Sequence, residues 1–415
     1  MTDLLSSIEQ IEILFRCLNQ KEIGQDLQGY GLQEWHGLLE QAKIQRLAPL
    51  VYKRVINKSG NDRLPGEVVM NFRDSYLSCL VRNLMVYNEL CKVLNQFNRN
   101  GIPTILLKGS YLAKFIYQDI GLRAMTDVDL MVDRSNLARA TAILRELDFS
   151  GQDLPLNPKE LEVYKHGSIL KKPGKINIEL HWTIADKDRG LTINEKDLWR
   201  CAEPLRIASS ECLALSPEDL ILHIVIHAIY SDRLIRHARS IVDLAEIINK
   251  ESDRIHWEIL FEKATQWQAE RGLYILLYMA RHYLNAPVPE DILAGTQPVD
   301  FIPSIAADIM CLFSQKEPGL SDRASQVMNS SLLGKGYALL KAAFPSRVSV
   351  GRIYHLEVDS WKVWIYYPRL WRDKVRHQKG YAKRLLSGKD DTSRRLNALY
   401  QVETWLQIPG FRHRS

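Results

Sequence analysis

The chain has 415 residues, of which 46% are hydrophobic and 25% charged, and this balance excludes a disordered chain. Its most apolar stretches are too short to span a bilayer, and the N-terminus lacks the basic segment and cleavage site of a signal peptide. The net charge of +6 comes from residues 366–415, where 12 Lys and Arg stand against 4 Asp and Glu. Six cysteines stand singly, without the spacing of a zinc site or disulfide framework, so we expect reduced thiols in a cytoplasmic protein.

Apolar residues at helical spacing predict helices within residues 1–100, the last of which ends at Asn98–Pro103. Residues 101–210 change to an α/β pattern. It comprises a strand at Thr104–Leu107, a helix at Tyr111–Tyr117 capped by Ser110, a strand at Asp127–Val132, a helix at Ser135–Leu147, and strands at Tyr164–Leu170 and Lys175–Trp182. Residues 211–300 return to helices, which we expect at 217–231, 236–249, 256–267 and 270–284.

Beyond these helices, Asn285–Pro289 gives the strongest boundary signal, and Leu332–Ala343 favours one more helix. Aromatic residues then precede the basic tail: Trp361, Trp364, Tyr366, Tyr367 and Trp371. Such a cluster can stack on bases, but packing inside a C-terminal subdomain is its commoner role. We therefore expect four regions: helices in 1–100, an α/β core in 101–210, a helical domain in 211–300, and a helical and aromatic region with a basic tail in 301–415.

The residues that suggest chemistry begin where the first strand of the core ends, at Lys108-Gly109-Ser110. A glycine there lets a ligand approach the backbone, and a helix N-terminus offers its free N–H groups to a phosphate. The next strand carries Asp127 and Asp129, which are two residues apart and so project to one face. Paired carboxylates repel unless a cation lies between them, and Mg²⁺ prefers such oxygens together with phosphate.

A third carboxylate, Glu179, lies on a later strand between the apolar residues Ile178 and Leu180. His181 shares the face of Glu179, where it can orient a ligand or serve as a structural histidine. Three carboxylates are what a two-metal site needs to clamp the attacking and leaving oxygens. The pattern indicates phosphoryl or nucleotidyl transfer.

These segments resemble the nucleotidyltransferase superfamily typified by DNA polymerase β. More narrowly, LKGSYLAKFIYQDIGLRAMTDVDLMV, INIELHW, LSPEDLILHIVIHA and LNAPVP are similar to a bacterial family of uncharacterised nucleotidyltransferases, found beside polysaccharide and lasso-peptide biosynthesis genes. The resemblance covers roughly residues 30–370 and is dense in 105–132 and 175–183. It implies an α+β fold, in which a polymerase β-like core of a small mixed sheet with flanking helices lies between N- and C-terminal helical regions.

The resemblance also implies roles for individual residues. They are metal binding and catalysis for Asp127, Asp129 and Glu179, and nucleotide binding for Lys108, Gly109, Ser110, Arg123 and His181. The ion would be Mg²⁺ or Mn²⁺, and a hydroxyl would attack the α-phosphorus of an NTP, ATP by default, with release of pyrophosphate. The acceptor would be a small molecule, a peptide or a protein. The superfamily has a shorter connection than Tyr111–Thr126 between its Gly-Ser and first acid, whereas the narrower family shares the long one.

Each residue has a structural alternative. The alternatives are a solvated acidic edge for Asp127 and Asp129, an ion pair with Lys175 for Glu179, a surface position for Lys108, a structural salt bridge for Arg123, and buried structural roles for His166 and His181. His223 and His227 share a helix face but lack the third ligand of a zinc site, and His227 can instead face the nucleotide cleft. For Asp243 we favour a buried salt bridge or a charge at a helix N-terminus.

Two other functions remain open at this point. One is a non-catalytic module of the same fold that binds a nucleotide or a peptide, against which the three carboxylates argue. The other is nucleic-acid binding or tailing, suggested by the basic tail but not favoured, because no separate basic motif accompanies it.

Overall fold

A computed structural model describes most of the chain. The described residues are 2–19, 30–56, 64–151, 165–167, 169–186, 190–232, 238–313, 350, 364–370, 372 and 390–407. The chain divides into two compact units: Ser7–Phe301, and Met1–Ser6 together with Ile302–Ser415. Among the described helices, none has both the length and the apolar character needed to cross a membrane.

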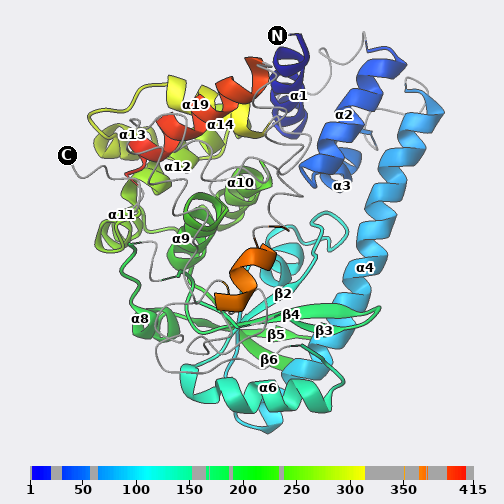
Figure 1. The fold of residues 1–415 in the computed structure, drawn as a ribbon, viewed down its shortest axis with the longest axis vertical. Coiled ribbons are helices and arrows are strands. Elements are labelled where there is room, and N and C mark those ends of the chain that lie inside the picture. The colour runs from blue at the N-terminus through cyan, green and yellow to red at the C-terminus, as the bar shows by residue number, and fades with distance from the viewer. Residues whose placement is uncertain are drawn as a thin grey trace. The chain divides into compact units, whose positions relative to one another are not determined.

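The unit Ser7–Phe301 is built on a six-stranded sheet with the strand order β3-β4-β2-β1-β6-β5 (Figure 1). The strands are β1 (Ile105–Leu106), β2 (Val128–Met131), β3 (Leu170–Lys172), β4 (Ile176–His181), β5 (Glu203–Ile207) and β6 (Ser210–Ala214). The sheet is mixed, because β1 runs antiparallel to β2 but parallel to β6, while β2 runs parallel to β4. The expected α+β fold, a mixed sheet flanked by helices, is confirmed.

The sheet differs from the sequence prediction at both edges. The strand expected at Tyr164–Leu170 lies at Leu170–Lys172, because Gly174, with a φ of +70°, closes a tight turn that pairs Lys172 with Ile176. Of the expected segment, Tyr164 lies outside the described residues and His166 forms only a single bridge to His181. The β5–β6 hairpin at the other edge was not anticipated.

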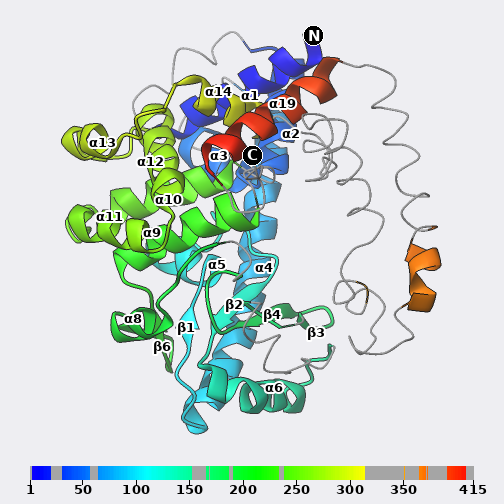
Figure 2. The ribbon, with the colours of Figure 1, turned by 60° about the vertical axis from the view of Figure 1, so that its left-hand side comes forward.

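Further helices precede the sheet in the chain or connect its strands. They are α1 (Thr2–Leu18), α2 (Leu32–Ile44), α3 (Ala48–Val51), η1 (Tyr52–Ile56), α4 (Gly66–Arg99), α5 (Gly109–Tyr111), η3 (Leu112–Ile116), η4 (Arg134–Asn136), α6 (Leu137–Glu146) and α8 (Glu195–Arg200). The 34-residue α4 buries Phe72, Val93 and Phe97 and packs against β4, β6 and α6 (Figure 2). At α6, the Asp133 carboxylate caps the preceding turn, since it accepts from the Ser135 N–H.

The helices after the sheet confirm the prediction for 217–284. They are α9 (Pro217–Ile226), continued by η6 (His227–Ser231), α10 (Arg239–Glu251), α11 (Trp257–Gln266), α12 (Glu270–Leu284) and α13 (Glu290–Thr296). Ser216 caps α9 by accepting from the Asp219 N–H, and Asn285 ends α12 in the left-handed conformation. The unit continues past Asn285–Pro289 to Phe301, so this turn ends a helix without ending the unit.

The other unit contains α14 (Ser304–Phe313) and α19 (Asp390–Trp405), which pack against each other, and a helical segment at 364–370. Tyr367 is buried in a small cluster with Val350 and Leu370, and Trp364 stacks on Tyr367 with ring centroids 5.4 Å apart. The helix expected at Leu332–Ala343 lies outside the described residues, as do Trp361, Trp371 and much of the basic tail. The division into four regions stays a prediction.

Candidate metal centre

Two neighbouring parallel strands bring the acidic residues together. The register of β2 and β4 places Asp129 beside Glu179, and His181 lies two residues further on the same face of β4. One ligand atom from each of Asp129, Glu179 and His181 lies within 4.8 Å of the others. Within the described part of the chain, this is the group of three acidic, histidine or cysteine side chains that can share one ion.

Asp129 is the centre of the group. Its carboxylate is buried, and Oδ1 lies 2.7 Å from His181 Nε2 and 2.9 Å from Lys108 Nζ. Burial opposes ionisation, yet the Lys108 ammonium and the His181 hydrogen bond hold the pKa of Asp129 well below its usual range. Glu179 is half-buried, with Oε2 3.6 Å from His181 Nε2, and this contact outweighs burial and lowers the pKa of Glu179. Both carboxylates are therefore charged and available to a cation at neutral pH.

In the absence of a metal ion, the Lys108 ammonium places a positive charge beside the carboxylates of Asp129 and Glu179. It follows β1 in a positive-φ conformation (φ +45°), which is rare for a residue with a side chain and marks local strain. Its side chain is only 16% exposed, so it is not the surface lysine of the alternative reading. Although burial opposes its charge, the carboxylates of Asp129 and Glu179 raise the pKa of the Lys108 ammonium.

Gly109 and Ser110 occupy positions that differ from the expected phosphate cradle. The helix begins at Gly109, so Lys108 rather than Ser110 is the N-cap residue. The Ser110 hydroxyl is buried and donates to the Leu107 carbonyl at 2.9 Å, which turns it away from a ligand. A Cβ at Gly109 would lie 2.5 Å from a guanidinium nitrogen of Arg123. The glycine therefore admits this side chain, and its N–H and that of Ser110 stay candidates for phosphate.

Arg123 is bound within the protein. Its guanidinium donates two hydrogen bonds to Asp243 on α10, at 3.2 and 2.8 Å, and Tyr117 donates a third to the same carboxylate at 2.8 Å. Burial opposes both charges, but the pair lowers the pKa of Asp243 and raises that of Arg123. This is the structural salt bridge weighed for both residues, and it links the loop after η3 to the helices that follow the sheet.

Asp127 lies outside the group of three. β2 begins at Val128, so Asp127 occupies the bend before the strand, where it is half-buried and accepts from the Thr126 hydroxyl at 2.9 Å. Its charge still contributes to the raised pKa of Lys108. The expected pairing of Asp127 with Asp129 as metal ligands therefore stays a prediction.

The long connection Tyr111–Thr126 is held by the outer helix α4. Asn83 donates to the carbonyls of Ile120 and Arg123, at 2.5 and 2.8 Å, and Arg82 donates to that of Met125 at 2.8 Å. Satisfying these backbone groups from one rigid helix fixes the path of the connection. The N-terminal helical region thus positions the segment between Lys108 and Asp129.

Further basic residues lie near this group in the structure. Lys165, only 6% exposed, reaches across to donate to the Ser231 hydroxyl at 2.8 Å, and burial together with the nearby Lys108 lowers its pKa. His223 is fully buried, and burial followed by Lys108 holds its pKa well below the usual range. The ring of His166 is tilted against that of His181, with ring centroids 5.0 Å apart. The four-residue spacing of His223 and His227 could have marked His223 as a site residue, whereas no pattern in the sequence marked Lys165.

The geometry agrees with the comparison to known proteins. A family described as uncharacterised nucleotidyltransferase matches residues 32–285, more than half of the chain. The chain belongs to this family. Membership makes it an enzyme of the nucleotidyltransferase kind, with nucleotidyl transfer as its general reaction and an NTP as substrate.

Solved nucleotidyltransferase structures show distant likeness to this family member. A solution structure of the antibiotic-resistance factor ANT(2'')-Ia is 15% identical, covering 48% of this chain and 97% of that one with a TM-score of 0.32. A crystal structure of an antigenic nucleotidyltransferase-like protein from Paracoccidioides brasiliensis is 13% identical, covering 50% and 95% with a TM-score of 0.32. No curated protein matches the chain. Likeness this distant assigns no substrate.

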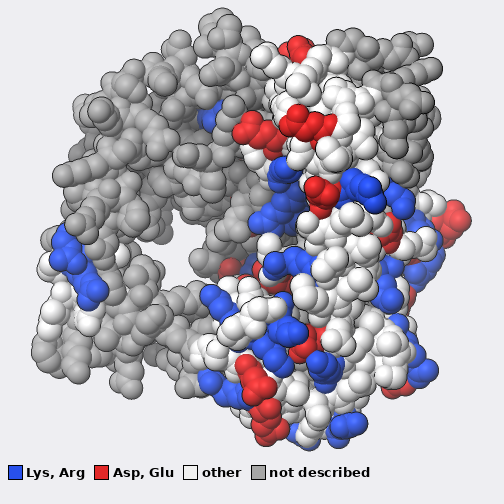
Figure 3. All heavy atoms as spheres, turned by 90° about the vertical axis from the view of Figure 1, so that its right-hand side faces the viewer, with Lys and Arg blue, Asp and Glu red and all other residues white. Residues whose placement is uncertain are grey.

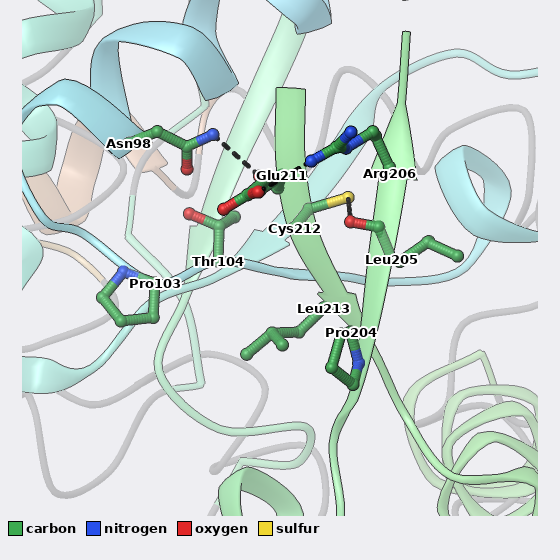
Figure 4. Close-up of a pocket in the computed structure, with 9 residues that line it drawn as sticks. All are labelled: Asn98, Pro103, Thr104, Pro204, Leu205, Arg206, Glu211, Cys212 and Leu213. Atoms are coloured by element: carbon green, nitrogen blue, oxygen red, sulfur yellow. Dashed lines mark hydrogen bonds and ion pairs between the residues drawn. The ribbon is translucent and has the colours of Figure 1, made fainter. Parts of the chain in front are cut away.

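A hollow lies at the opposite end of β1 from Lys108 (Figure 4). Its volume is about 470 Å³ and its lining is Asn98, Pro103, Thr104, Pro204, Leu205, Arg206, Glu211, Cys212 and Leu213. Arg206 pairs with Glu211 at 2.9 Å, and burial raises the pKa of the Cys212 thiol to about 12. The charges of Arg206 and Glu211 are thus paired, and the thiol is a poor nucleophile.

Proposed function

We propose that this family member transfers an NMP, with AMP from ATP as the default, to a hydroxyl of a small-molecule, peptide or protein acceptor and releases pyrophosphate. The observation that carries the proposal is the buried group of Asp129, Glu179 and His181 with Lys108 beside it. Two ionised carboxylates in a buried site fit a divalent cation such as Mg²⁺ or Mn²⁺. When bound, that ion would neutralise the phosphates and lower the pKa of the acceptor hydroxyl.

The protein's own residues provide the rest of the machinery. Asp129 and Glu179 hold the ion on a rigid sheet, so their positions change little during the reaction. The Lys108 ammonium is close enough to lower the pKa of Lys165, and we assign both cations to the charge of the triphosphate. The backbone N–H groups of Gly109 and Ser110 begin the helix beside Lys108 and complete the phosphate contacts.

Arg123 has a positioning role in this proposal. Its pairing with Asp243 holds the guanidinium against Gly109, so it fixes the turn that presents Lys108. We retain Asp127 as a ligand for a second ion that arrives with the nucleotide, because its carboxylate lies near enough to raise the pKa of Lys108. Reduced thiols suit a cytoplasmic enzyme, and none of the six cysteines, all of which the structure describes, forms a disulfide.

The described part of one face gives little support to a polynucleotide as the acceptor. Basic and acidic side chains are interspersed over the described part of the face on the α4 side (Figure 3). A polynucleotide needs a continuous basic path, since neutralised phosphates supply most of the affinity. We therefore favour a compact acceptor that presents one hydroxyl.

The test measures pyrophosphate release and label transfer together. Each of the four NTPs, labelled at the α-phosphate, is incubated with Mg²⁺ or Mn²⁺, the full-length protein and a fractionated pool of small molecules and peptides. We expect one NTP to label an acceptor, with loss of at least about 100-fold in rate for Asp129→Asn and Glu179→Gln. Glu211→Gln, an exposed carboxylate on β6, is the matched control.

Each outcome has a definite reading. Labelled product that survives in Asp129→Asn refutes the assigned centre. Metal-dependent NTP binding without release of pyrophosphate from any NTP and pool points to the non-catalytic module.

A further inference from the structure

We infer that His181 is itself a metal ligand, in the place that the sequence assigned to Asp127, and that the centre consequently selects Mn²⁺ over Mg²⁺. The inference rests on the proposed function in one respect, namely that Asp129, Glu179 and His181 form the metal centre. It concerns which side chains of the chain bind the ion and which ion they prefer.

The spacing of the ligand atoms fits one shared ion. His181 Nε2 lies 2.7 Å from Asp129 Oδ1 and 3.6 Å from Glu179 Oε2. Two ligands at adjacent corners of an octahedral ion, with bonds of about 2.1 Å, lie about 3.0 Å apart. The two His181 distances lie on either side of that spacing, and all three ligand atoms lie within 4.8 Å of one another, so one ion can reach them. Asp127 does not belong to this set, and its carboxylate bonds to Thr126.

The imidazole is held rigidly and turned toward the carboxylates. His181 is 1% exposed at the end of β4, and its carbonyl accepts from the Val132 N–H at 2.9 Å. Nε2 contacts the carboxylates of Asp129 and Glu179, while Nδ1 is buried with no hydrogen-bond partner among the described residues. Nε2 therefore lies between two acids, as a ligating nitrogen does. When the ion binds, Nε2 gives up the hydrogen that it donates to Asp129, and the neutral ring carries its hydrogen on Nδ1 instead.

The chemistry of the three ligand atoms determines which divalent ion the site prefers. Mg²⁺ prefers oxygen ligands and retains several bound waters, so replacing one oxygen ligand by an imidazole nitrogen is unfavourable for it. Imidazole suits first-row transition ions, and carboxylates suit Mn²⁺ as well as Mg²⁺. One nitrogen and two carboxylate oxygens therefore favour Mn²⁺. Three carboxylates, as the resemblance implied, would show no such preference.

The test reads the metal–nitrogen bond directly on the full-length protein, without nucleotide or acceptor. Mn²⁺ is titrated and free ion is followed by electron paramagnetic resonance, and Mg²⁺ is then added as a competitor. We expect Mn²⁺ to bind at least tenfold more tightly than Mg²⁺. Pulsed resonance on the Mn²⁺ complex should show coupling to a nitrogen nucleus, and protein labelled with ¹⁵N-histidine should change that coupling.

Three variants assign the nitrogen. His181→Asn removes the imidazole but keeps a hydrogen-bond donor for Asp129, and it should abolish the coupling and bring the two affinities within about threefold. His166→Asn, the neighbouring histidine, should keep both the coupling and the preference. Asp127→Asn should keep the coupling and change the Mn²⁺ affinity by less than about threefold.

Several results would overturn the inference. Wild-type protein that binds Mn²⁺ without nitrogen coupling refutes it, whether or not the variants fold. So does coupling that survives in His181→Asn or disappears in His166→Asn, and so does an Asp127→Asn variant that loses Mn²⁺ as completely as Glu179→Gln. Because no transfer is measured, a protein with nitrogen-coupled Mn²⁺ and no turnover upholds this inference while the proposed function fails.

Discussion

Replacing Lys108 by Met tests whether its ammonium holds the place of the metal. The Nζ–Oδ1 distance to Asp129 is 2.9 Å, which corresponds to a Coulomb attraction of about 6 kcal/mol at an effective dielectric constant near 20. Desolvation of both groups offsets much of this attraction, and breaking a buried pair typically costs ~3–5 kcal/mol. Because His181 still hydrogen-bonds Asp129, we expect a loss near ~3 kcal/mol in the metal-free protein.

The same substitution should improve metal binding. In the wild type a cation that takes Asp129 Oδ1 must displace or repel the Lys108 ammonium, whereas methionine leaves the carboxylate uncompensated. If metal binding to the wild type costs only about 1.4 kcal/mol of the Lys108–Asp129 interaction free energy, the variant binds the ion ~10-fold more tightly. Ligand linkage then makes Mn²⁺ raise the unfolding free energy more in the variant than in the wild type.

The assay is urea unfolding of both proteins with and without Mn²⁺, together with a direct metal titration. Lys165→Met is the control, since Lys165 is also a buried cation but donates to Ser231 instead of Asp129. Equal or weaker Mn²⁺ binding by Lys108→Met would refute the reasoning, because it would mean that the ammonium supports the ion rather than competing with it.

Three further substitutions probe the framework. Asp243→Asn leaves the Arg123 guanidinium buried without its counter-ion and should cost ~3–5 kcal/mol by urea unfolding at pH 7. Because the pKa of Asp243 is lowered in the fold, the difference from wild type should shrink as the pH falls below about 4. His223→Gln should make the unfolding free energy fall less steeply as the pH drops below ~6.5. In the wild type the unfolded chain binds a proton there that the buried imidazole does not, which steepens the dependence on pH by up to ~1.4 kcal/mol per pH unit. An unchanged slope in the variant would contradict the burial argument. Gly109→Ala should cost ~1–3 kcal/mol in thermal unfolding because its Cβ meets the guanidinium of Arg123, whereas Gly295→Ala, with open space around it, should not destabilise.

Local patterns in the sequence predicted the parts of the site that depend on local geometry. Alternation placed Glu179 and His181 on one face of a strand, and helical spacing predicted the helices of 217–284, which the structure confirms. The β5–β6 hairpin escaped notice because Pro204 and charged residues interrupt the pattern of a buried strand. The strand before the turn at Gly174 was placed too early for the same reason, since its lysines do not alternate with apolar residues.

Contacts between distant segments could not be predicted from such patterns. The register that sets Asp129 beside Glu179 joins residues far apart in the chain, and so does the pairing of Arg123 with Asp243. Both depend on how the whole sheet and the following helices assemble, which a local period does not encode. Arg123 shows the consequence, because its charge suited a triphosphate while its actual partner lay on a helix more than a hundred residues away.

The charges at the centre suggest why a lysine accompanies the carboxylates. Without an ion, Asp129, Glu179 and Lys108 carry one net negative charge, and this favours entry of a cation over entry of a nucleotide. A divalent ion reverses that sign and frees the Lys108 ammonium from Asp129. The same ammonium can then turn to the phosphates that the ion attracts. On this reasoning the strained backbone at Lys108 contributes to function, because it holds the ammonium where it can pair first with the carboxylates and then with the triphosphate.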